Sequence, residues 1–141
     1  MPAYNAARTI ERTYAEIPLD LVDEVVLTDD ASRDETVEIA RRLGLRTLVH
    51  ERNRGYGGNQ KIGYQYAVEK GFDVVALLHG DGQYAPELLP QMVAPLERGE
   101  CDAVFGSRML EPGSARSGGM PLYKFVGNRI IRTSAIFRRI K

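Results

Sequence analysis

Three carboxylates stand close together directly after a short apolar run in the first third of the chain. The segment is residues 28–34, TDDASRD, and it follows the apolar residues 25–27. Carboxylates at such a place can bind a cation, or accept hydrogen bonds from the N–H groups of a base and the hydroxyl groups of a ribose. The alternative is that Ser32 and Asp34 only cap the next helix, which would leave the adjacent, mutually repelling Asp29 and Asp30 without a purpose.

A lone carboxylate, Asp81, follows a second apolar run. It lies in residues 79–84, HGDGQY, after the apolar residues 74–78. A carboxylate between two glycines at the end of a buried strand is a credible site for a hard cation, and His79 and Gln83 could orient water or donate to a nearby oxygen. Because one Asp seldom holds Mg²⁺ alone, the ion would also need a second carboxylate, water or ligand phosphates. The alternative is a polar turn between a strand and a helix.

Two glycine-rich segments offer places for an anionic ligand. Residues 53–61, NRGYGGNQK, combine glycines that let a backbone approach a phosphate with a helix N-terminus behind them. They match neither common phosphate-binding motif, and a flexible loop is an equal alternative. Residues 106–120 are rich in glycine and basic, and could close over an anionic ligand, the alternative being a disordered crossover loop.

Apolar runs and helical patterns alternate along the chain, which predicts a parallel α/β sheet flanked by helices. Strands are expected at residues 25–27, 47–49, 74–78 and 103–105. Helices are expected at residues 6–17, 37–43 and 88–96, where apolar residues recur with helical spacing. A Ser32–Glu35 capping box and Gly44 would bound the second of these helices, and Pro86 and Pro121 suit first-turn positions. Ligands of such sheets bind beyond the carboxyl ends of the strands, which is where the polar segments lie.

The composition is that of one soluble domain. The 141 residues leave no room for a second domain, and 43% hydrophobic and 27% charged residues are average for globular proteins. No apolar run approaches the roughly 18 residues that cross a bilayer. The one cysteine, Cys101, cannot form an internal disulfide, which favours a protein in the cytoplasm or on the cytoplasmic face of a membrane.

The charge is balanced overall but uneven along the chain. A net charge of zero argues against a nucleic-acid partner. Residues 122–141 hold six Lys and Arg and no acid, which predicts a basic amphipathic helix. This helix could make peripheral contact with a membrane surface, or it could be an ordinary solvated helix.

Both ends of the chain are expected to be truncations. Only residues 1–5 precede the first predicted helix, so the strand that should come before that helix in a parallel α/β fold is missing. The chain also stops inside the basic helix. Without its missing strand, the sheet would leave backbone groups unpaired beside the strand that ends at Asp29, and the isolated chain is expected to be poorly stable.

These segments, in their order and spacing, resemble family 2 glycosyltransferases. The matching set is PAYN at 2–5, DDxSxDxT at 29–36, NxG at 53–55, HGDGQY at 79–84 and GSR at 106–108, and it spans nearly the whole chain. The similarity is greatest to the branch with dolichol-phosphate mannosyltransferase and polyprenyl-phosphate glucosyltransferases. The resemblance implies a GT-A fold, a Rossmann-like, mostly parallel sheet with flanking helices that binds a nucleotide-sugar at its strand ends.

The resemblance also implies roles for particular residues. Asp81 and Arg108 would be the catalytic residues, with Asp81 on a divalent cation, Mg²⁺ or Mn²⁺, that bridges the diphosphate. The residues expected to bind the nucleotide-sugar are Pro2, Tyr4, Asn5, Asp29, Asp30, Gly55, Lys61 and Gln83. His79 stands where the family's D-x-D motif has its first acid, so only the second carboxylate remains. The family's acceptor-side Asp would lie beyond Lys141, and no catalytic base is assigned.

By this resemblance, residues 1–141 are a single, partial catalytic domain. It would be an inverting enzyme that moves a hexose from a UDP- or GDP-sugar to a polyprenyl phosphate or a related acceptor. The alternative is a catalytically inactive fragment or a nucleotide-sugar-binding module. Turnover of a labelled donor, with and without lipid phosphate, separates the two.

Overall fold

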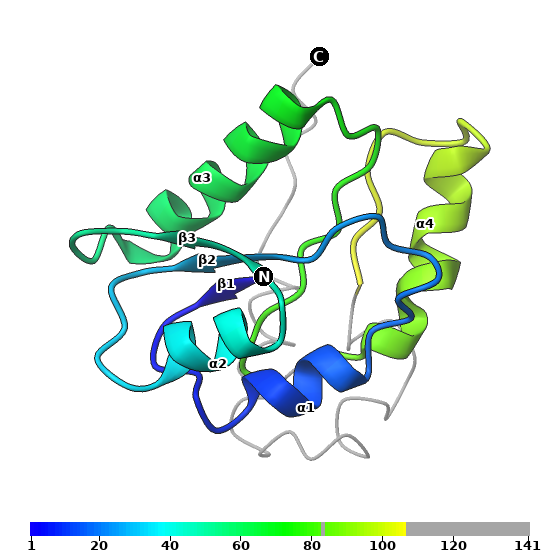
Figure 1. The fold of residues 1–141 in the computed structure, drawn as a ribbon. Coiled ribbons are helices and arrows are strands. Elements are labelled where there is room, and N and C mark those ends of the chain that lie inside the picture. The colour runs from blue at the N-terminus through cyan, green and yellow to red at the C-terminus, as the bar shows by residue number, and fades with distance from the viewer. Residues whose placement is uncertain (83, 107–141) are drawn as a thin grey trace, which may run out of the picture. The chain divides into compact units, whose positions relative to one another are not determined.

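Three short parallel strands form the sheet of the computed structural model, which describes residues 1–82 and 84–106 (Figure 1). The strands are β1 (Pro2–Ala3), β2 (Val26–Asp29) and β3 (Arg46–Val49), side by side in that order. Because the strands are parallel, the residues that follow them share one edge of the sheet. We call this edge the carboxyl edge; it comprises residues 4–5, 30–34 and 50–54.

The chain divides into two compact units, residues 1–104 and 105–141, and nearly all described residues belong to the first. Gln83, Arg108, the basic segment up to residue 120 and the predicted helix from Pro121 lie outside the described residues. The expectation of a single domain over residues 1–141 stays a prediction.

Two of the four predicted strands are confirmed, and two are wrong. The runs at 25–27 and 47–49 become β2 and β3, whereas residues 74–78 and 103–105 form no regular strand. Within the described residues, the backbone hydrogen bond next to the former segment comes just after it, from Gly80 N to Pro2 O of β1 at 3.3 Å. A two-residue neighbour offers too few partners for a ladder, and the side chains of Val74, Val75 and Leu77 stay partly in solvent.

The expectation that no strand precedes the first helix is also wrong, because β1 does. Met1 O accepts a hydrogen bond from Thr28 N at 2.9 Å, and Pro2 lies opposite Thr28 in the parallel register. Two residues are too short to show as an apolar run, and proline is tolerated as the first residue of a strand. β1 lies between β2 and the segment that carries Gly80, the place expected for the missing strand.

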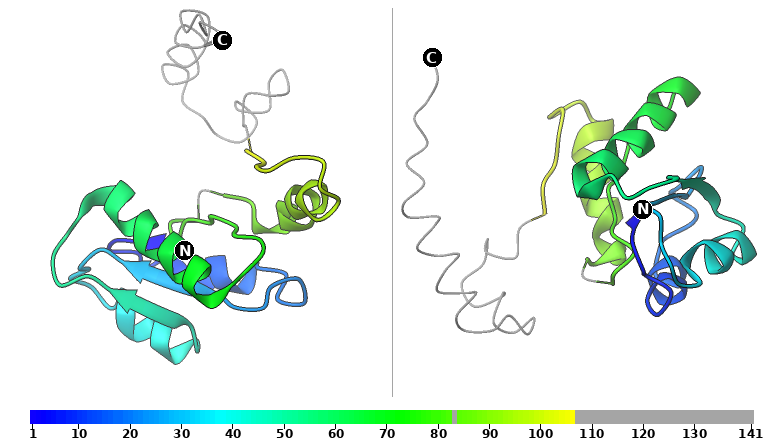
Figure 2. Two further views of the ribbon diagram at one scale, coloured as in Figure 1. Left: turned by 90° about the horizontal axis from the view of Figure 1, so that it is seen from above. Right: turned by 90° about the vertical axis from the view of Figure 1, so that its left-hand side faces the viewer.

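Helices cover both faces of this sheet. Figures 1 and 2 show α1 (Ile10–Ala15) and α2 (Thr36–Arg42) on one face and α3 (Gly55–Lys70) on the other. Successive side chains of β2 point to opposite faces of the sheet, which explains the two layers. Leu27 points toward α1 and α2, and Thr28 points toward α3. A Cβ added to Gly63 of α3 would lie 3.3 Å from Thr28 Cγ2, which shows how closely that helix packs.

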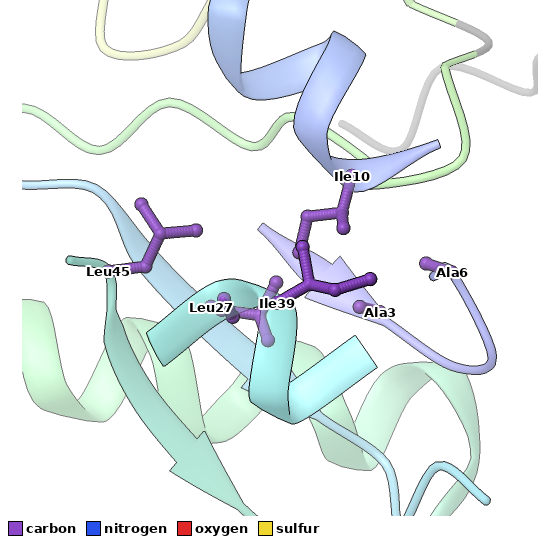
Figure 3. Close-up of a cluster of buried hydrophobic side chains, with 7 residues drawn as sticks. Ala3, Ala6, Ile10, Leu27, Ile39 and Leu45 are labelled. Atoms are coloured by element: carbon purple, nitrogen blue, oxygen red, sulfur yellow. The ribbon is translucent and has the colours of Figure 1, made fainter. Parts of the chain in front are cut away.

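The main core lies between β2 and the α1–α2 layer. Figure 3 shows the side chains of Ile10, Leu27 and Ile39 directed toward one another from α1, β2 and α2. The other buried members of this cluster are Ala3, Ala6, Ala40 and Leu45. A second, smaller cluster of Ile17, Leu78 and Leu89 lies at the start of α4 (Leu89–Glu97), which follows the short 3₁₀ helix η1 (Pro86–Leu88). The predicted first-turn position of Pro86 is thereby confirmed.

The start of α2 differs from the predicted capping box. Glu35 stands at the N-cap position without a side-chain hydrogen bond, and Ser32 bonds to other partners. Asp34 instead accepts a bond from Thr36 N at 3.1 Å. At the other end the prediction is confirmed, since Gly44 has φ +79° and follows the last turn.

Substituting alanine at two glycines should therefore change stability in opposite directions. A Cβ would meet nothing within 4 Å at Gly44 or at Gly57, so only the backbone decides. Gly44→Ala should lower the free energy of unfolding by about 1 kcal/mol, because the left-handed region penalises a Cβ. Gly57→Ala should raise it by up to about 1 kcal/mol, because alanine favours the α3 helix. Urea unfolding measures both, and a loss in both variants would contradict the assignment.

Candidate functional site

Asp29, the last residue of β2, is buried and its carboxylate is satisfied locally. Its exposed fraction is 0%, Oδ2 accepts a hydrogen bond from Ser32 N at 2.8 Å, and Oδ1 accepts a short one from Ser32 Oγ. Ala31 between them has φ +60°. These bonds close a tight turn, so Asp29 shapes the loop that carries its neighbour.

Asp30 is almost as buried but keeps one acceptor position open. Its backbone N donates to Ala3 O at 3.0 Å, and its Oδ1 accepts from Arg54 N at 2.7 Å. Among the described residues, its second carboxylate oxygen receives no hydrogen bond. Asp30 is therefore the member of the acidic pair that can still accept a bond from a ligand.

Side chains cross-link the loops of the carboxyl edge. Asn5, at φ +51°, donates its N–H to Ser32 Oγ at 2.9 Å and accepts from Arg33 N on Oδ1 at 2.9 Å. Ala6 N donates to Thr36 Oγ1 at 2.7 Å. The side chain of Asn5 is thus committed to the neighbouring loop, whereas the ring of Tyr4 beside it is 51% exposed.

Asn59 of α3 holds β1 and β2 together next to the carboxyl edge. It is 3% exposed, and its Nδ2 donates to Thr28 O at 2.8 Å and to Ala3 O at 3.3 Å. One side chain thereby bridges β1 and β2 immediately before the residues of the edge. In the sequence Asn59 stands in a glycine-rich segment, and nothing in that segment signals this role.

The residues around Asp81 are anchored next to β1. Thr9 Oγ1 donates to Gly80 O at 2.6 Å, and a Cβ on Gly80 would lie 3.6 Å from the Cβ of Ala3. These contacts hold the loop beside the carboxyl edge, and Asp81 itself is exposed. The polar segment at 79–82 therefore joins those that follow β1 and β2, as the fold predicts.

Two tyrosine side chains, Tyr56 and Tyr84, contact the ring of His79. Nε2 of His79 lies 2.7 Å from the hydroxyl of Tyr56, which is in the first turn of α3. The ring of His79 also contacts that of Tyr84, with 4.7 Å between the centroids. Burial lowers the pKa of His79, and the nearby Asp81 opposes this shift. His79 therefore presents a largely neutral ring at pH 7, at the position where the family's D-x-D motif has its first carboxylate.

The donor set suits a cation only with help from a ligand. Among residues 1–82 and 84–106, no three His, Cys, Asp or Glu side chains lie close enough together to hold a metal ion. Oxygens of Asp29 and Asp30 are already bonded to the backbone. An exposed Asp81 with phosphate oxygens and water fits the way in which proteins bind Mg²⁺.

The remaining predicted residues are placed as follows. Pro2 is buried in β1, and Lys61 is exposed on α3. Gly55 begins α3 with φ +74°, and its N donates to Asn53 Oδ1 at 3.0 Å. The glycine-rich segment is thus mainly helix. A Cβ on Gly58 would lie 2.7 Å from the Cβ of Arg54, so this glycine serves packing.

Other parts of the described unit do not contribute to this edge. A solvent-open depression of about 630 Å³ lies at the opposite, amino ends of β2 and β3, and its lining includes Val25, Arg46 and Thr47 but no predicted site residue. Within the part of the chain that the structure describes, no helix combines the length and the apolar character needed to cross a bilayer.

Comparison with known proteins agrees with this geometry. The profile of glycosyl transferase family 2 matches residues 1–138. The chain is 29% identical over 145 residues to UDP-N-acetylglucosamine–dolichyl-phosphate N-acetylglucosaminyltransferase of Methanococcus voltae, with 91% of this chain and 57% of the relative covered. It is 32% identical over 120 residues to undecaprenyl-phosphate mannosyltransferase of Micrococcus luteus, with 80% and 48% covered.

A third relative is also named as a sugar transferase with a lipid phosphate in its name. The chain is 29% identical over 132 residues to dolichol-phosphate mannosyltransferase of Pyrococcus furiosus, with 88% of this chain and 36% of the relative covered. The chain therefore spans about half, or less, of the length of these curated relatives. The parallel α/β sheet agrees with the GT-A fold that the sequence resemblance implied, and the names support the same branch. Because the profile covers nearly all of its residues, the chain belongs to glycosyl transferase family 2.

Proposed function

We propose that this chain is the nucleotide-sugar-binding part of a glycosyltransferase. It would move a hexose, with inversion, from a UDP- or GDP-sugar to a polyprenyl phosphate or a related acceptor. The observation that carries the proposal is the convergence of Tyr4, Asp30 and Asp81 at one edge of a parallel sheet, where such folds bind nucleotides. The names of three relatives, which specify dolichyl, dolichol or undecaprenyl phosphate, support the acceptor class.

The nucleoside end of the donor would lie over β1 and β2. The open oxygen of Asp30 would accept a hydrogen bond from a base N–H or a ribose hydroxyl. Tyr4 follows Ala3, whose carbonyl accepts from Asp30 N, and its exposed ring would offer an apolar surface to the base. Asp29, Asn5 and Asn59 hold these groups in place through hydrogen bonds to neighbouring residues. The diphosphate would then extend toward the loop of Gly80 and Asp81.

Asp81 is the residue that would hold a divalent cation together with the diphosphate. A bound Mg²⁺ or Mn²⁺ would supply positive charge next to the phosphate oxygens that become the leaving group. Arg108, which lies outside the described residues, is proposed to bind the donor phosphate or sugar.

The transfer itself needs little base catalysis. An oxygen of the acceptor phosphate is already anionic, attacks the anomeric carbon and forms the new C–O bond, while the bond from that carbon to the diphosphate breaks. In-line attack opposite the leaving group inverts the anomeric centre. The chief contribution of the protein is then to position the two substrates and to stabilise the departing diphosphate.

Turnover of labelled sugar donors tests this proposal. The chain is incubated with radiolabelled UDP- or GDP-hexoses and Mn²⁺, with and without dolichyl or undecaprenyl phosphate, and lipid-linked label is extracted. We expect label in the lipid phase only when lipid phosphate is present. Nucleotide binding without any turnover would favour the alternative, a nucleotide-sugar-binding module, and the absence of both would contradict the proposal.

Asp29 and Asp30 should respond differently to the same substitution. Asp30→Asn replaces the open acceptor by an amide and should weaken nucleotide binding by about 5- to 150-fold, equivalent to about 1–3 kcal/mol for a buried unmet group. Asp29→Asn should instead lower the free energy of unfolding, because the turn with Ser32 loses a charged acceptor. Calorimetric titration with UDP and GDP and urea unfolding of both variants measure this. Equal losses of affinity would show that both acids contact the ligand.

We also propose that the protein acts at the cytoplasmic face of a membrane. The lipid phosphates in the relatives' names support a location at a membrane. The six Lys and Arg within residues 122–141 would attract anionic lipid headgroups, at about 1 kcal/mol for each basic side chain. This helix lies outside the described residues and stays a prediction.

A further inference from the structure

Tyr56, His79 and Tyr84 form a small cluster beside the carboxyl edge. The Tyr56 hydroxyl lies 2.7 Å from His79 Nε2, and the two ring centroids are 5.1 Å apart with planes inclined by 44°. The rings of His79 and Tyr84 are 4.7 Å apart and inclined by 41°. The three side chains come from different segments: the first turn of α3, the loop before Asp81 and the residues before η1.

Burial of apolar surface does not account for this ordering. Tyr56 and Tyr84 are 57% and 50% exposed, and none of the three side chains belongs to either hydrophobic cluster. Fixing an exposed aromatic side chain costs rotamer freedom, and little buried area offsets this cost. The hydrogen bond of Tyr56 therefore fixes the orientation of the His79 ring, which sits two residues before the proposed cation ligand.

The direction of this hydrogen bond follows from the two groups. Burial, and secondarily the neighbouring Tyr84, raise the pKa of Tyr56, so its phenol keeps its proton. A neutral imidazole has one nitrogen that carries a proton and one that accepts, and this nitrogen is a stronger acceptor than a phenol oxygen. Donation from the phenol O–H to Nε2 corresponds to a neutral ring whose proton is on Nδ1.

We propose that Tyr56 is a positioning residue that makes His79 a fixed N–H donor, through Nδ1, for an oxygen of the bound diphosphate-sugar. The proposal rests on the proposed function. It specifies how His79, which stands where the family's D-x-D motif has its first acid, takes part in donor binding. A carboxylate there would need a cation between itself and the diphosphate. A neutral N–H donor makes an attractive contact directly.

Nitrogen-detected NMR of the imidazole rings tests the first step without any ligand. The chain has only two histidines, His50 and His79, so a His79→Gln sample assigns the signals. At pH 8, above the ordinary histidine pKa of about 6.5, the wild-type His79 should show the tautomer with the proton on Nδ1. Tyr56→Phe should remove this preference, whereas Tyr64→Phe, the same change further along α3, should leave it intact.

Titration with UDP and GDP in the presence of diamagnetic Mg²⁺ tests the second step. Nucleotide should shift the Nδ1 signal of His79, and Tyr56→Phe should weaken binding by about two- to tenfold, the effect of one net hydrogen bond. Tyr64→Phe should bind as the wild type does. An unchanged tautomer in Tyr56→Phe, or a nucleotide affinity unchanged by this substitution, would overturn this inference and leave the proposed function standing. Failure of the wild type to bind either nucleotide would overturn the inference together with the proposed function.

Discussion

Replacing Asp81 by asparagine should lower kcat/KM for sugar transfer by at least about 100-fold in the presence of Mn²⁺, the range seen when one group that stabilises transition-state charge is removed. Asn keeps the size of the side chain but loses the negative charge that a divalent cation requires. The loop around it should keep its shape, since Thr9 and Pro2 hold the backbone of Gly80. Initial rates at several Mn²⁺ concentrations measure the effect.

Asp73→Asn is the matched control for this experiment. Asp73 is also exposed and precedes the same apolar segment, but it lies before residues 74–78, at the end of the segment remote from Asp81. Its substitution should leave both the rate and the Mn²⁺ dependence unchanged. If Asp81→Asn kept the wild-type Mn²⁺ dependence, the assignment of Asp81 to a cation would be wrong, whatever the rate.

Leu27→Ala should lower the free energy of unfolding by about 2–5 kcal/mol. Leu27 is 0% exposed at the centre of β2, and its side chain fills the space between Ile10 of α1 and Ile39 of α2 (Figure 3). A cavity there cannot collapse easily, because three elements border it. Since a domain is stable by only about 5–15 kcal/mol, this one change would remove a large part of its stability.

Urea unfolding followed by circular dichroism measures this loss. Val68→Ala on α3 is the control, because Val68 is 79% exposed and its substitution should change stability by less than about 0.5 kcal/mol. A loss below about 1 kcal/mol for Leu27→Ala would show that the layer of α1 and α2 is not the principal core.

The sequence predicted those elements whose signal is local. The apolar stripes of the three predicted helices, the run at 25–27 and Gly44 all act through residues a few positions apart. The structure has helices at Ile10–Ala15, Thr36–Arg42 and Leu89–Glu97 and a strand at Val26–Asp29, within or close to the predicted ranges. The run at 74–78 has the same local signal, but a strand also needs a neighbour with enough backbone groups to pair. β1 provides two residues, and no property of residues 74–78 themselves reveals that.

The candidate site was predictable as a set of segments and not as a set of contacts. Residues 2–5, 29–34 and 79–82 do meet at one edge, because parallel strands place their carboxyl ends together. The difference between Asp29 and Asp30 depends on partners 3 and 24 positions away, Ser32 and Arg54. The bond from Tyr56 to His79 spans 23 positions, which no motif spacing records.

The cross-links of the carboxyl edge have a consequence for the thermodynamics of association. Asn5, Asp30 and Thr36 join three loops through side-chain to backbone bonds, and Asn59 fixes the strands beneath them. A ligand that meets loops already held in this way does not have to order them, so little of its interaction energy is lost to conformational entropy. For the proposed nucleotide, the heat capacity change on binding should therefore reflect burial of the ligand and its contact surface, with no added contribution from loop folding.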